Sequence, residues 1–456
     1  MPLSVVILAA GQGKRMHSRL PKVLQPLAGK PMLAHVIDQA RRLRADGIHV
    51  VFGYGGEAVR AAFSETDLVW HEQAEQLGTG HAVVQALPAI PEEHQVLVLC
   101  GDVPLISETA LEALVHGGGD SGLVLLTAEL DDPTGYGRIL RGLDGSVVAI
   151  IEEADATDDQ RRITEINTGL LTAPASMLHK WINRLDQGNV QREFYLTDIV
   201  VHAVEDGVTV TGAKIDAAVE VLGINDRLQL AAAERTLQWI RAESLIRAGV
   251  SIADPARIEV RGEIEVGRDV FVDIGAIFIG KVTLGDGCRI GPHVLIKDSS
   301  IGPGTLVHAN SIIDNSQTGA NCEIGPFARL RPETKLCESV KIGNFVETKM
   351  SSIGNGSKVN HLSYIGDSAI GSQVNVGAGT ITCNYDGANK HRTTIGDDVF
   401  IGSGVNLVAP IEIGRGATIG AGSTLTKDAP SGELSLARTR QTSVPGWERP
   451  KKKSVD

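Results

Sequence analysis

A six-residue repeat in the second half of the sequence restricts the possible folds more than any other feature. After Asp254, apolar residues recur at every sixth position, and many are followed at once by glycine. The first run comprises Val266, Val272, Phe278, Leu284, Ile290 and Ile296. Each six residues can form one face of a triangular coil whose axis the apolar side chain fills, whereas a β-sandwich alternates with a period of two. With 52 glycines and an aromatic content of only 4%, the repeat predicts a parallel β-helix over residues 251–456.

One segment of this half does not fit the repeat. Residues Cys383 to His391 interrupt the coil, and the repeat resumes at Ile395. The segment must therefore loop outward. Because loops on a rigid scaffold often carry functional residues, we expect a binding site here.

Two cations of the β-helix, Arg331 and Lys349, are 18 residues apart. Residues at this spacing can lie one coil above another, so the two side chains would form a pair. Such a pair suits a sugar phosphate. The alternative is that Arg331 is only a solvent-exposed residue at the edge of a coil.

The first 225 residues have a different pattern, in which short apolar runs alternate with helical segments. We expect strands at residues 4–10, 48–53, 95–100 and 122–128, and helices at residues 31–43 and 81–87. This alternation is typical of an α/β domain with a mostly parallel sheet and helices on both faces. Ligands of such domains bind beyond the carboxyl ends of the strands. A continuous helical pattern over residues 226–250 would link the two domains.

The composition excludes several classes of partner. The net charge of −12 opposes binding to nucleic acid and anionic membranes. No stretch reaches the roughly 18 apolar residues of a membrane span, and the first strand lacks the charged leader of a signal peptide. Five scattered cysteines without a Cys-x-x-Cys pair indicate reduced, mostly buried thiols. We expect a cytoplasmic protein with neither nucleic acid nor membrane as a partner.

A glycine-rich turn follows the first strand. It contains Gly11 and Gly13, but neither the third glycine of the dinucleotide fingerprint nor a P-loop signature follows. No acidic residue occurs before Asp38, although several cations, including Arg15 and Lys22, lie in this stretch. Backbone N–H groups of such a turn and nearby cations can hold a polyphosphate. The alternative is a solvated basic loop.

The motifs of the first half carry a resemblance to a known family. Residues 8–16 read LAAGQGKRM and are followed by Pro21-Lys22, which resembles the opening pattern of sugar-nucleotide pyrophosphorylases, with Lys14 in place of the usual Thr or Ser. Further matching motifs are QAEQLGTGH at 73–81, GDVPL at 101–105, DDPTGYGR at 131–138 and EINTG at 165–169. Over essentially its whole length, the chain is similar to the bacterial bifunctional N-acetylglucosamine-1-phosphate uridylyltransferase/glucosamine-1-phosphate N-acetyltransferase enzymes.

The resemblance implies a Rossmann-like nucleotidyltransferase domain at residues 1–225, a linker helix at 226–250 and a left-handed parallel β-helix at 251–456. The β-helix would transfer an acetyl group from acetyl-CoA to glucosamine-1-phosphate. The first domain would then transfer uridylyl from UTP to N-acetylglucosamine-1-phosphate, releasing pyrophosphate. A homotrimer is also implied, with some site residues contributed by a neighbouring subunit.

The resemblance also assigns residues to the nucleotide reaction. The UTP and UDP-sugar set comprises Leu8, Ala9, Ala10, Gly11, Arg15, Lys22, Gln73, Gly78, Thr79, Gly101, Asp102, Gly137, Glu152, Asn167 and Asn225. Arg15 and Lys22 would hold phosphates, and Asp102 and Asn225 would hold Mg²⁺. Gln73, Gly78 and Thr79 would read the uracil. The last group to be assigned, which would bind the sugar, is Gly137, Glu152 and Asn167.

Each of these assignments has a simpler alternative. Asp102 could be an ordinary turn residue, and Asn225 could be only the N-cap of the following helix. Gln73 could be a surface residue. Glu152, beside Glu153, could belong to a solvated face.

For the acetyl reaction, the resemblance assigns His361 as the general base that takes a proton from the sugar amine. Glucosamine-1-phosphate would bind to Arg331, Lys349, Tyr364 and Asn375. The implied acetyl-CoA residues are Ala378, Asn384, Tyr385, Ser403, Ala421 and Arg438.

Two other functions stay open from the sequence. One is a single-function sugar-nucleotide pyrophosphorylase that uses the β-helix as a scaffold. The other is a non-catalytic regulatory binding protein. A scaffold would need only the repeat, and a regulatory protein would not need Arg15, Lys22 and Asp102, so the residues favour the two-step enzyme.

Overall fold

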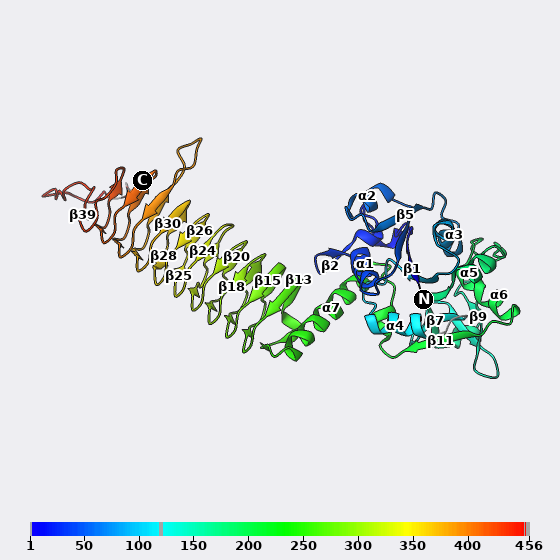
Figure 1. The fold of residues 1–456 in the computed structure, drawn as a ribbon. Coiled ribbons are helices and arrows are strands. Elements are labelled where there is room, and N and C mark those ends of the chain that lie inside the picture. Colours follow the sequence, from blue (N-terminus) through cyan, green and yellow to red (C-terminus); the bar gives the residue numbers. More distant parts are fainter. Residues whose placement is uncertain (1, 118–121, 451, 453–456) are drawn as a thin grey trace. The chain divides into compact units, whose positions relative to one another are not determined.

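The structure, a computed structural model, describes residues 2–117, 122–450 and 452 of the chain. It divides into two compact units, Met1–Leu237 and Gln238–Asp456. Figure 1 shows layered helices and strands in the first unit and a coil of short strands in the second. Helix α7 (Arg227–Arg247) runs across the division, so its first residues belong to one unit and its later residues to the other.

The first unit is built on a mixed β-sheet. Its strands are β1 (Leu3–Ala9), β4 (Gly47–Phe52), β5 (Leu68–Glu72), β6 (Gln95–Cys100), β7 (Leu123–Glu129), β8 (Arg138–Arg141), β9 (Val147–Ile151), β10 (Glu165–Pro174) and β11 (Val210–Ile215). The main path has the order β11-β7-β10-β6-β1-β4-β5, and its pairs are parallel except for the two that β10 makes. The expected strands correspond to β1, β4, β6 and β7 and are confirmed. A small separate sheet pairs β2 (Pro26–Leu27) with β3 (Lys30–Pro31).

Helices cover both faces of this sheet. They are α1 (Met32–Arg42), α2 (Gly56–Ala61), α3 (Thr79–Ala86), α4 (Glu108–His116), α5 (Ala175–Ile182) and α6 (Ile199–Glu205). Because side chains alternate along a strand, β1 sends Val5 and Ile7 to a cluster that includes Ile37 of α1, and Val6 to a second cluster that includes Val83 of α3. The helices expected at 31–43 and 81–87 are α1 and α3. Short 3₁₀ helices lie at Lys14–Met16, Lys22–Leu24, Leu87–Ala89, Gln160–Arg162, Leu196–Asp198, Ala218–Val221 and Pro255–Arg257.

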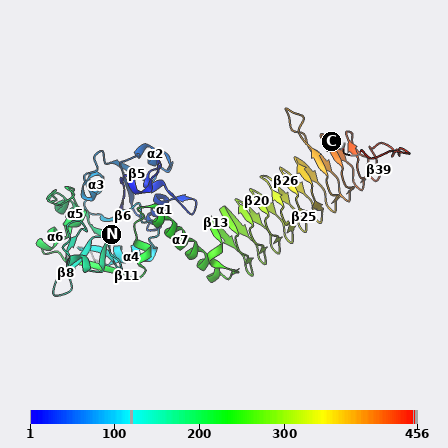
Figure 2. The same ribbon diagram turned by 180° about the vertical axis from the view of Figure 1, so that it is seen from behind.

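The second unit is a parallel β-helix (Figures 1 and 2). One of its sheets contains β12 (Ser251–Ile252), β14 (Phe271–Val272), β16 (Arg289–Ile290), β19 (Leu306–Val307), β22 (Glu323–Ile324), β25 (Lys341–Asn344), β28 (Lys358–His361), β31 (Asn375–Val376), β34 (Phe400–Ile401), β37 (Thr418–Ile419) and β39 (Leu434–Ser435). The remaining strands are β13 (Glu259–Val266), β15 (Ile277–Leu284), β17 (Leu295–Lys297), β18 (Ser300–Ile301), β20 (Ile312–Asp314), β21 (Gln317–Thr318), β23 (Arg329–Leu330), β24 (Lys335–Leu336), β26 (Glu347–Lys349), β27 (Ser352–Ile353), β29 (Tyr364–Gly366), β30 (Ser368–Ile370), β32 (Ile381–Cys383), β33 (Thr393–Ile395), β35 (Asn406–Val408), β36 (Ile411–Ile413) and β38 (Thr424–Leu425).

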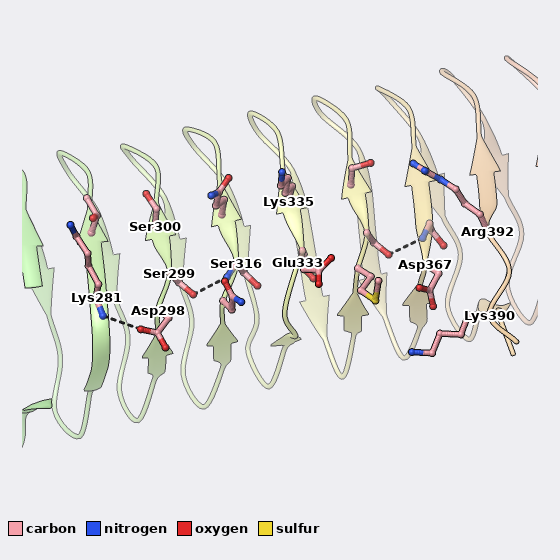
Figure 3. Close-up of a pocket in the computed structure, with 18 of the residues that line it drawn as sticks. Lys281, Asp298, Ser299, Ser300, Ser316, Glu333, Lys335, Asp367, Lys390 and Arg392 are labelled. Atoms are coloured by element: carbon pink, nitrogen blue, oxygen red, sulfur yellow. Dashed lines mark hydrogen bonds between the residues drawn. The ribbon is translucent and has the colours of Figure 1, made fainter. Parts of the chain in front are cut away.

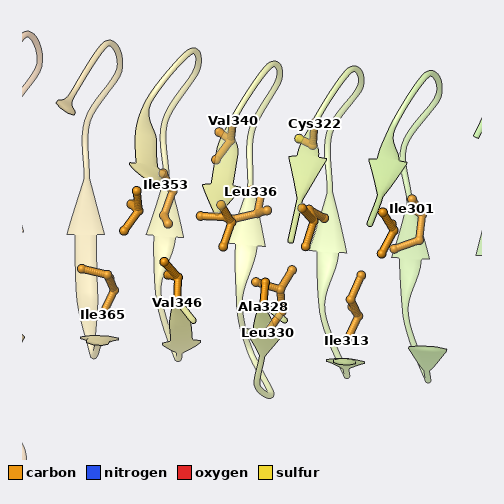
Figure 4. Packing of buried hydrophobic residues seen from close by; sticks show 14 of the residues in the cluster. Ile301, Ile313, Cys322, Ala328, Leu330, Leu336, Val340, Val346, Ile353 and Ile365 are labelled. Atoms are coloured by element: carbon orange, nitrogen blue, oxygen red, sulfur yellow. The ribbon is translucent and has the colours of Figure 1, made fainter. Parts of the chain in front are cut away.

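The apolar residues of the six-residue repeat fill the interior of this coil. Phe278 pairs in register with Ile296, which in turn pairs with Ile313, so one coil takes 17 or 18 residues. All three side chains are buried in one continuous cluster, which extends through Leu330 and Ile365. Figure 4 shows such side chains stacked in successive coils. The repeat therefore places one apolar layer on the next, as expected.

The corners of the coil need residues in the left-handed conformation. At one corner, Gly404 and Gly422 have φ of 67° and 71°, which glycine adopts without strain. Below them at the same corner lie Phe327, Phe345 and Leu362, with φ of 55°, 57° and 48°. These three apolar side chains are exposed, and the two phenylalanine rings stack with centroids 5.4 Å apart.

The expected excursion from the coil is present. Strand β32 ends at Cys383 and β33 begins at Thr393, and the chain between them folds back on itself. Tyr385 and Lys390 form an antiparallel bridge. We call residues 384–392 the insertion hairpin.

All five cysteines are free, but they are less buried than expected. Cys288 and Cys322 are buried, and Cys100 and Cys383 are partly buried. Cys337 is exposed, because it directly follows the interior residue Leu336 and lies on the outside of the coil. Within the part of the chain that the structure describes, no helix combines the length and apolar character needed to cross a membrane.

Candidate functional site

A pocket of about 630 Å³ opens at the carboxyl ends of β1 and β6 in the first unit. This is where the α/β pattern predicts a ligand. The expected residues that line it are Leu8, Ala9, Ala10, Gly11, Arg15, Lys22, Gln73, Gly78, Thr79, Asp102 and Asn225. They come from distant parts of the sequence, so the fold brings together most of the predicted nucleotide set.

The glycine-rich turn forms one wall of this pocket. Gly13 has φ of 60°, and a Cβ atom there would lie only 2.5 Å from Cβ of Lys22. The turn therefore packs directly against the stem of the lysine. Arg15 is exposed in the short helix that follows. Gly101 is not among the residues that line the pocket, but its backbone N–H donates to Leu8 O at 2.9 Å and ties β1 to the start of the Asp102 turn.

A cation and two oxygen ligands meet at the base of the pocket. The Lys22 ammonium donates to Asp102 Oδ2 and, at 2.7 Å, to Asn225 Oδ1. Asp102 is therefore more than a turn residue. Asn225 is not the N-cap of α7, because the side chain of Asp226 accepts the hydrogen bond from Gln229 N at 2.8 Å. Nearby, burial raises the pKa of Cys100 to about 12, so this thiol stays protonated.

The residues expected to read uracil form one corner of the pocket, in which Gln73 is buried, Gly78 is partly buried and Thr79 is exposed. Gln73 is 3% exposed, and its amide donates to Gly78 O at 3.0 Å, so it is not a surface residue. Gly78 has φ of 112°, and a Cβ atom there would lie 2.6 Å from Phe194 O. Thr79 Oγ1 accepts a hydrogen bond from Leu196 N at 3.0 Å.

The expected sugar residues form a separate cluster. Asn167 N donates to Gly137 O at 2.8 Å, and a Cβ atom on Gly137 would lie 3.4 Å from Glu152 Oε2. Glu152 accepts a hydrogen bond from Thr197 Oγ1 at 3.0 Å. Burial, together with neighbouring carboxylates such as Asp198, raises the pKa of Glu152. Glu152 is therefore not part of a solvated face, although none of these three expected residues lines the nucleotide pocket itself.

The segment from Glu193 to Thr197 was missed by the sequence reasoning. Glu193 lines the pocket, while Thr197 contacts Glu152 in the sugar cluster. Between them, Phe194 N donates to Leu77 O at 2.8 Å. The segment thus connects the uracil corner with the sugar cluster. It carries no glycine-rich or charged pattern that could have revealed it.

The second unit holds three cations side by side. Arg331 Nη1 donates to Glu347 Oε1 at 2.7 Å. The Lys390 ammonium lowers the pKa of Lys349, and the charge of Arg331 adds to this effect. The pairing of Arg329 with Glu347 puts Arg331 in register with Lys349, so the predicted stacking is confirmed. Lys390 belongs to the insertion hairpin and was not predicted. Three cations at one place favour a dianionic phosphate.

Polar side chains surround this cation cluster. Asn384 is 8% exposed; its amide donates to Asp367 and lies 3.5 Å from the hydroxyl of Tyr364. Tyr385 is exposed in the hairpin, where its hydroxyl donates to Gly387 O at 2.6 Å. The base of the insertion hairpin is thereby fixed beside Tyr364.

His361 lies at the end of β28, one coil above Asn344. The two residues pair in register, and His361 Nδ1 lies 2.9 Å from Asn344 Oδ1. When Nδ1 donates to this oxygen, Nε2 keeps its lone pair and can accept a proton. The ring is exposed to solvent.

Four of the expected acetyl-CoA residues form a column along the corner above His361, whereas Asn384 and Tyr385 belong to the insertion hairpin. Gly379 N donates to His361 O at 3.4 Å, Gly404 N to Ala378 O at 2.7 Å, and Gly422 N to Ser403 O at 2.8 Å. Above them, Arg438 Nη1 donates to Ala421 O at 2.6 Å. The column comprises His361, Ala378, Ser403, Ala421 and Arg438. Asn375 lies in β31, in a different sheet from Lys349 of β26, and is in register with Lys358 and Phe400.

A polar groove of about 870 Å³ runs along another part of the β-helix. Figure 3 shows Lys281 and Asp298 at one end of it and Asp367 and Lys390 at the other. Its lining is rich in serine and threonine. The groove therefore borders the cation cluster at Lys390 and extends away from it.

Known protein families match segments of both units. Residues 5–168 match the MobA-like NTP transferase domain, residues 260–346 match the GMPPB C-terminal domain, and residues 392–427 match the bacterial transferase hexapeptide (six repeats). Together with the parallel coils, the hexapeptide match agrees with the left-handed β-helix that the resemblance implied.

Curated relatives match over nearly the whole chain. Proteins named "Bifunctional protein GlmU" are 56% identical in Alkalilimnicola ehrlichii, 55% in Marinobacter nauticus and 57% in Xanthomonas axonopodis pv. citri. These matches cover 98%, 99% and 100% of this chain and 96%, 99% and 99% of the respective relatives.

Proposed function

The chain belongs to the family of bifunctional GlmU proteins, and we propose that its two units carry out the two consecutive steps of UDP-N-acetylglucosamine synthesis with the residues described above. The β-helix acetylates glucosamine-1-phosphate. The first unit then joins the product to uridylyl from UTP. The single observation that carries this proposal is the coexistence, in one chain of this family, of a pocket around Lys22 and Asp102 in the first unit and a cluster of Arg331, Lys349 and Lys390 in the second.

In the nucleotide step, a phosphate oxygen of the sugar phosphate attacks the α-phosphorus of UTP and pyrophosphate leaves. No covalent intermediate on the protein is needed, so catalysis depends on positioning and on charge. Arg15, Lys22 and the N–H groups of the glycine-rich turn bind the phosphates. Gln73, Gly78 and Thr79 hold the uracil. Gly137, Glu152 and Asn167 orient the sugar.

Asp102 and Asn225 fit a divalent cation, because their oxygens already share one cationic group, the Lys22 ammonium. Carboxylate and amide oxygens are the ligands that Mg²⁺ takes in proteins, with phosphate and water completing its shell. Mg²⁺ held there supplies charge neutralisation between the two anionic reactants.

In the acetyl step, the amine nitrogen of glucosamine-1-phosphate attacks the thioester carbonyl of acetyl-CoA, and the CoA thiolate leaves. His361 Nε2 accepts the proton that the amine loses. Arg331, Lys349 and Lys390 hold the phosphate of the acceptor, with Tyr364 and Asn375 completing its site. The acetyl-CoA set is Ala378, Asn384, Tyr385, Ser403, Ala421 and Arg438.

A homotrimer in the cytoplasm is the proposed form of the enzyme. The exposed corner formed by Phe327, Phe345 and Leu362 supports association, because clustered apolar side chains on a surface favour contact with another protein chain. Light scattering on the purified chain checks this: a mass of three chains supports it, and a monomer contradicts it. The cytoplasm is where acetyl-CoA and UTP are available, and the product is a precursor of cell-wall polymers.

The function is tested by incubating the purified protein with glucosamine-1-phosphate, acetyl-CoA, UTP and Mg²⁺ while following free CoA and pyrophosphate separately. We expect both products, with pyrophosphate depending on acetyl-CoA unless N-acetylglucosamine-1-phosphate is supplied. Pyrophosphate without CoA would indicate a single-function pyrophosphorylase. Release of neither CoA nor pyrophosphate would indicate a regulatory protein.

The two-site assignment is tested with His361→Ala. Removing a general base typically costs 10²- to 10⁴-fold in rate, so we expect CoA release to fall by roughly this factor. Pyrophosphate formation from N-acetylglucosamine-1-phosphate should stay at the wild-type rate. Equal loss of both activities would contradict two independent sites.

A further inference from the structure

The Lys22 ammonium lies between the two side chains assigned to the divalent cation. It contacts Asp102 Oδ2 and Asn225 Oδ1 together, although these residues are 80 and 203 positions away in the sequence. The Lys22 side chain is 11% exposed and that of Asp102 is 24% exposed, so the ion pair is largely removed from solvent. The ammonium thus uses the same oxygens that a metal ion would need.

A second cation at these oxygens is disfavoured. Each hydrogen bond from the ammonium occupies one of the lone pairs available to a metal ion, and an ammonium and a metal ion that share an oxygen repel each other. A buried carboxylate also needs a cation partner, which Lys22 supplies in the free protein. Lys22 therefore stabilises the empty arrangement and opposes metal binding to it.

The second role of Lys22 lies immediately beside the first. Its stem packs against Gly13 in the glycine-rich turn, the turn that would carry the phosphates. A polyphosphate bound there would offer the ammonium new anionic oxygens a short distance from Asp102. The lysine has a flexible four-carbon stem and can change partner without movement of the backbone.

We propose that Lys22 is an exchangeable internal counter-ion: it holds Asp102 and Asn225 closed to divalent cations in the free protein and gives them up when a polyphosphate arrives. This inference rests on the proposed assignment of Asp102 and Asn225 to the divalent cation. Its consequence is that the metal ion enters together with the nucleotide and binds poorly to the free protein. The device keeps the cation site from filling before the substrate is present.

The test measures Mn²⁺ binding to the full-length protein without nucleotide, by electron paramagnetic resonance of the free ion. Mn²⁺ is the probe because it also prefers oxygen ligands. Lys22→Met removes the competing ammonium and should lower the Kd for Mn²⁺ by roughly tenfold or more, since hydrogen bonds to charged groups are among the strongest in proteins. Lys22→Gln should act in the same direction and guards against a packing defect specific to methionine.

Lys14→Met is the matched control, because it removes a positive charge from the same pocket at a residue that forms neither a hydrogen bond nor an ion pair with Asp102 or Asn225. It should change the Kd less than twofold. An unchanged or weaker Mn²⁺ affinity in both Lys22 variants would overturn the proposal, and so would a gain in Lys14→Met equal to that in Lys22→Met.

A further variant separates this proposal from the site on which it rests. Lys22→Met combined with Asp102→Asn should lose the gained affinity. If the double variant still binds Mn²⁺ as tightly as Lys22→Met, the ion binds elsewhere and the proposal fails. Failure of the proposed function would instead appear as absence of pyrophosphate release by the wild-type enzyme, which the binding experiment does not measure.

Discussion

His361 and Asn344 lie in register on adjacent coils of the β-helix, with His361 Nδ1 2.9 Å from Asn344 Oδ1. This contact holds the ring in place and leaves Nε2 available for the proposed role of proton acceptor. Asn344→Ala should therefore lower kcat of acetyl transfer by roughly five- to tenfold, the effect of one net hydrogen bond. Pyrophosphate formation should be unchanged. The rate is measured by CoA release, and wild-type acetylation in this variant would show that the contact does not position the base.

The insertion hairpin is held by Asp386. One carboxylate oxygen accepts hydrogen bonds from Ala388 N at 2.8 Å and Asn389 N at 2.6 Å, and the other lies 2.7 Å from His391 Nε2. The bond from the Asn389 backbone, together with that from His391, holds the pKa of Asp386 well below its usual range. Asp386 therefore orders the hairpin that carries Lys390.

Asp386→Asn should raise KM for glucosamine-1-phosphate by roughly tenfold, because a neutral amide is a weaker acceptor than a carboxylate and the hairpin loosens. Acetylation kinetics measure this effect, and trypsin cleavage after Lys390 should become faster. The matched control is Asp428→Asn, since Asp428 also accepts a backbone hydrogen bond, from Glu412 N at 2.8 Å, and is exposed elsewhere in the β-helix. If both variants raise KM equally, the hairpin has no special role.

We predict that any side chain at Gly78 weakens UTP binding in the uracil corner. Gly78→Ala would put a Cβ atom 2.6 Å from Phe194 O and force a left-handed φ of 112° on alanine. We expect KM for UTP to rise at least tenfold while acetyl transfer is retained, because displacing Phe194 also moves the segment that reaches Glu152. Gly145→Ala is the control. Gly145 also has a positive φ, of 83°, but nothing lies within 4 Å of the added Cβ atom, so this variant introduces backbone strain without a steric clash. Normal UTP kinetics in Gly78→Ala would contradict the assignment.

A buried histidine makes the first unit sensitive to acid. Burial, with the charges of His71 and His94, lowers the pKa of His49 to about 4, and His49 Nδ1 lies 3.0 Å from His71 Nε2. Between pH 6.5 and pH 4, the unfolded chain takes up a proton at this residue and the folded protein does not. The free energy of unfolding therefore falls as the pH falls through this window.

His49→Asn removes that difference. From pH 7 to pH 4.5, the variant should lose about 1–2 kcal/mol less unfolding free energy than the wild type. Urea unfolding of the two proteins at both pH values measures this, and comparing the losses cancels the titration of groups that do not interact with His49. Parallel losses would show that His49 titrates normally in the folded protein.

The sequence alone determined the architecture of both units. The six-residue period defines which side chains fill the coil, and it predicted the layers of Phe278, Ile296 and Ile313 because each coil repeats the same local geometry. The break at Cys383 likewise predicted the insertion hairpin. The residue assignments came from motifs and from the resemblance. The structure brings most of the predicted nucleotide-binding residues together in one pocket.

Only the tertiary structure decided which side chains meet. The ion pair of Lys22 with Asp102, the contact of Thr197 with Glu152 and the approach of Lys390 to Lys349 join residues that no local pattern relates. Sequence periodicity reports the burial of apolar side chains, which recurs in every turn of an element. Contacts between polar side chains depend on how loops return to one place, and the physical reason they escape a sequence pattern is that they occur once and leave no period.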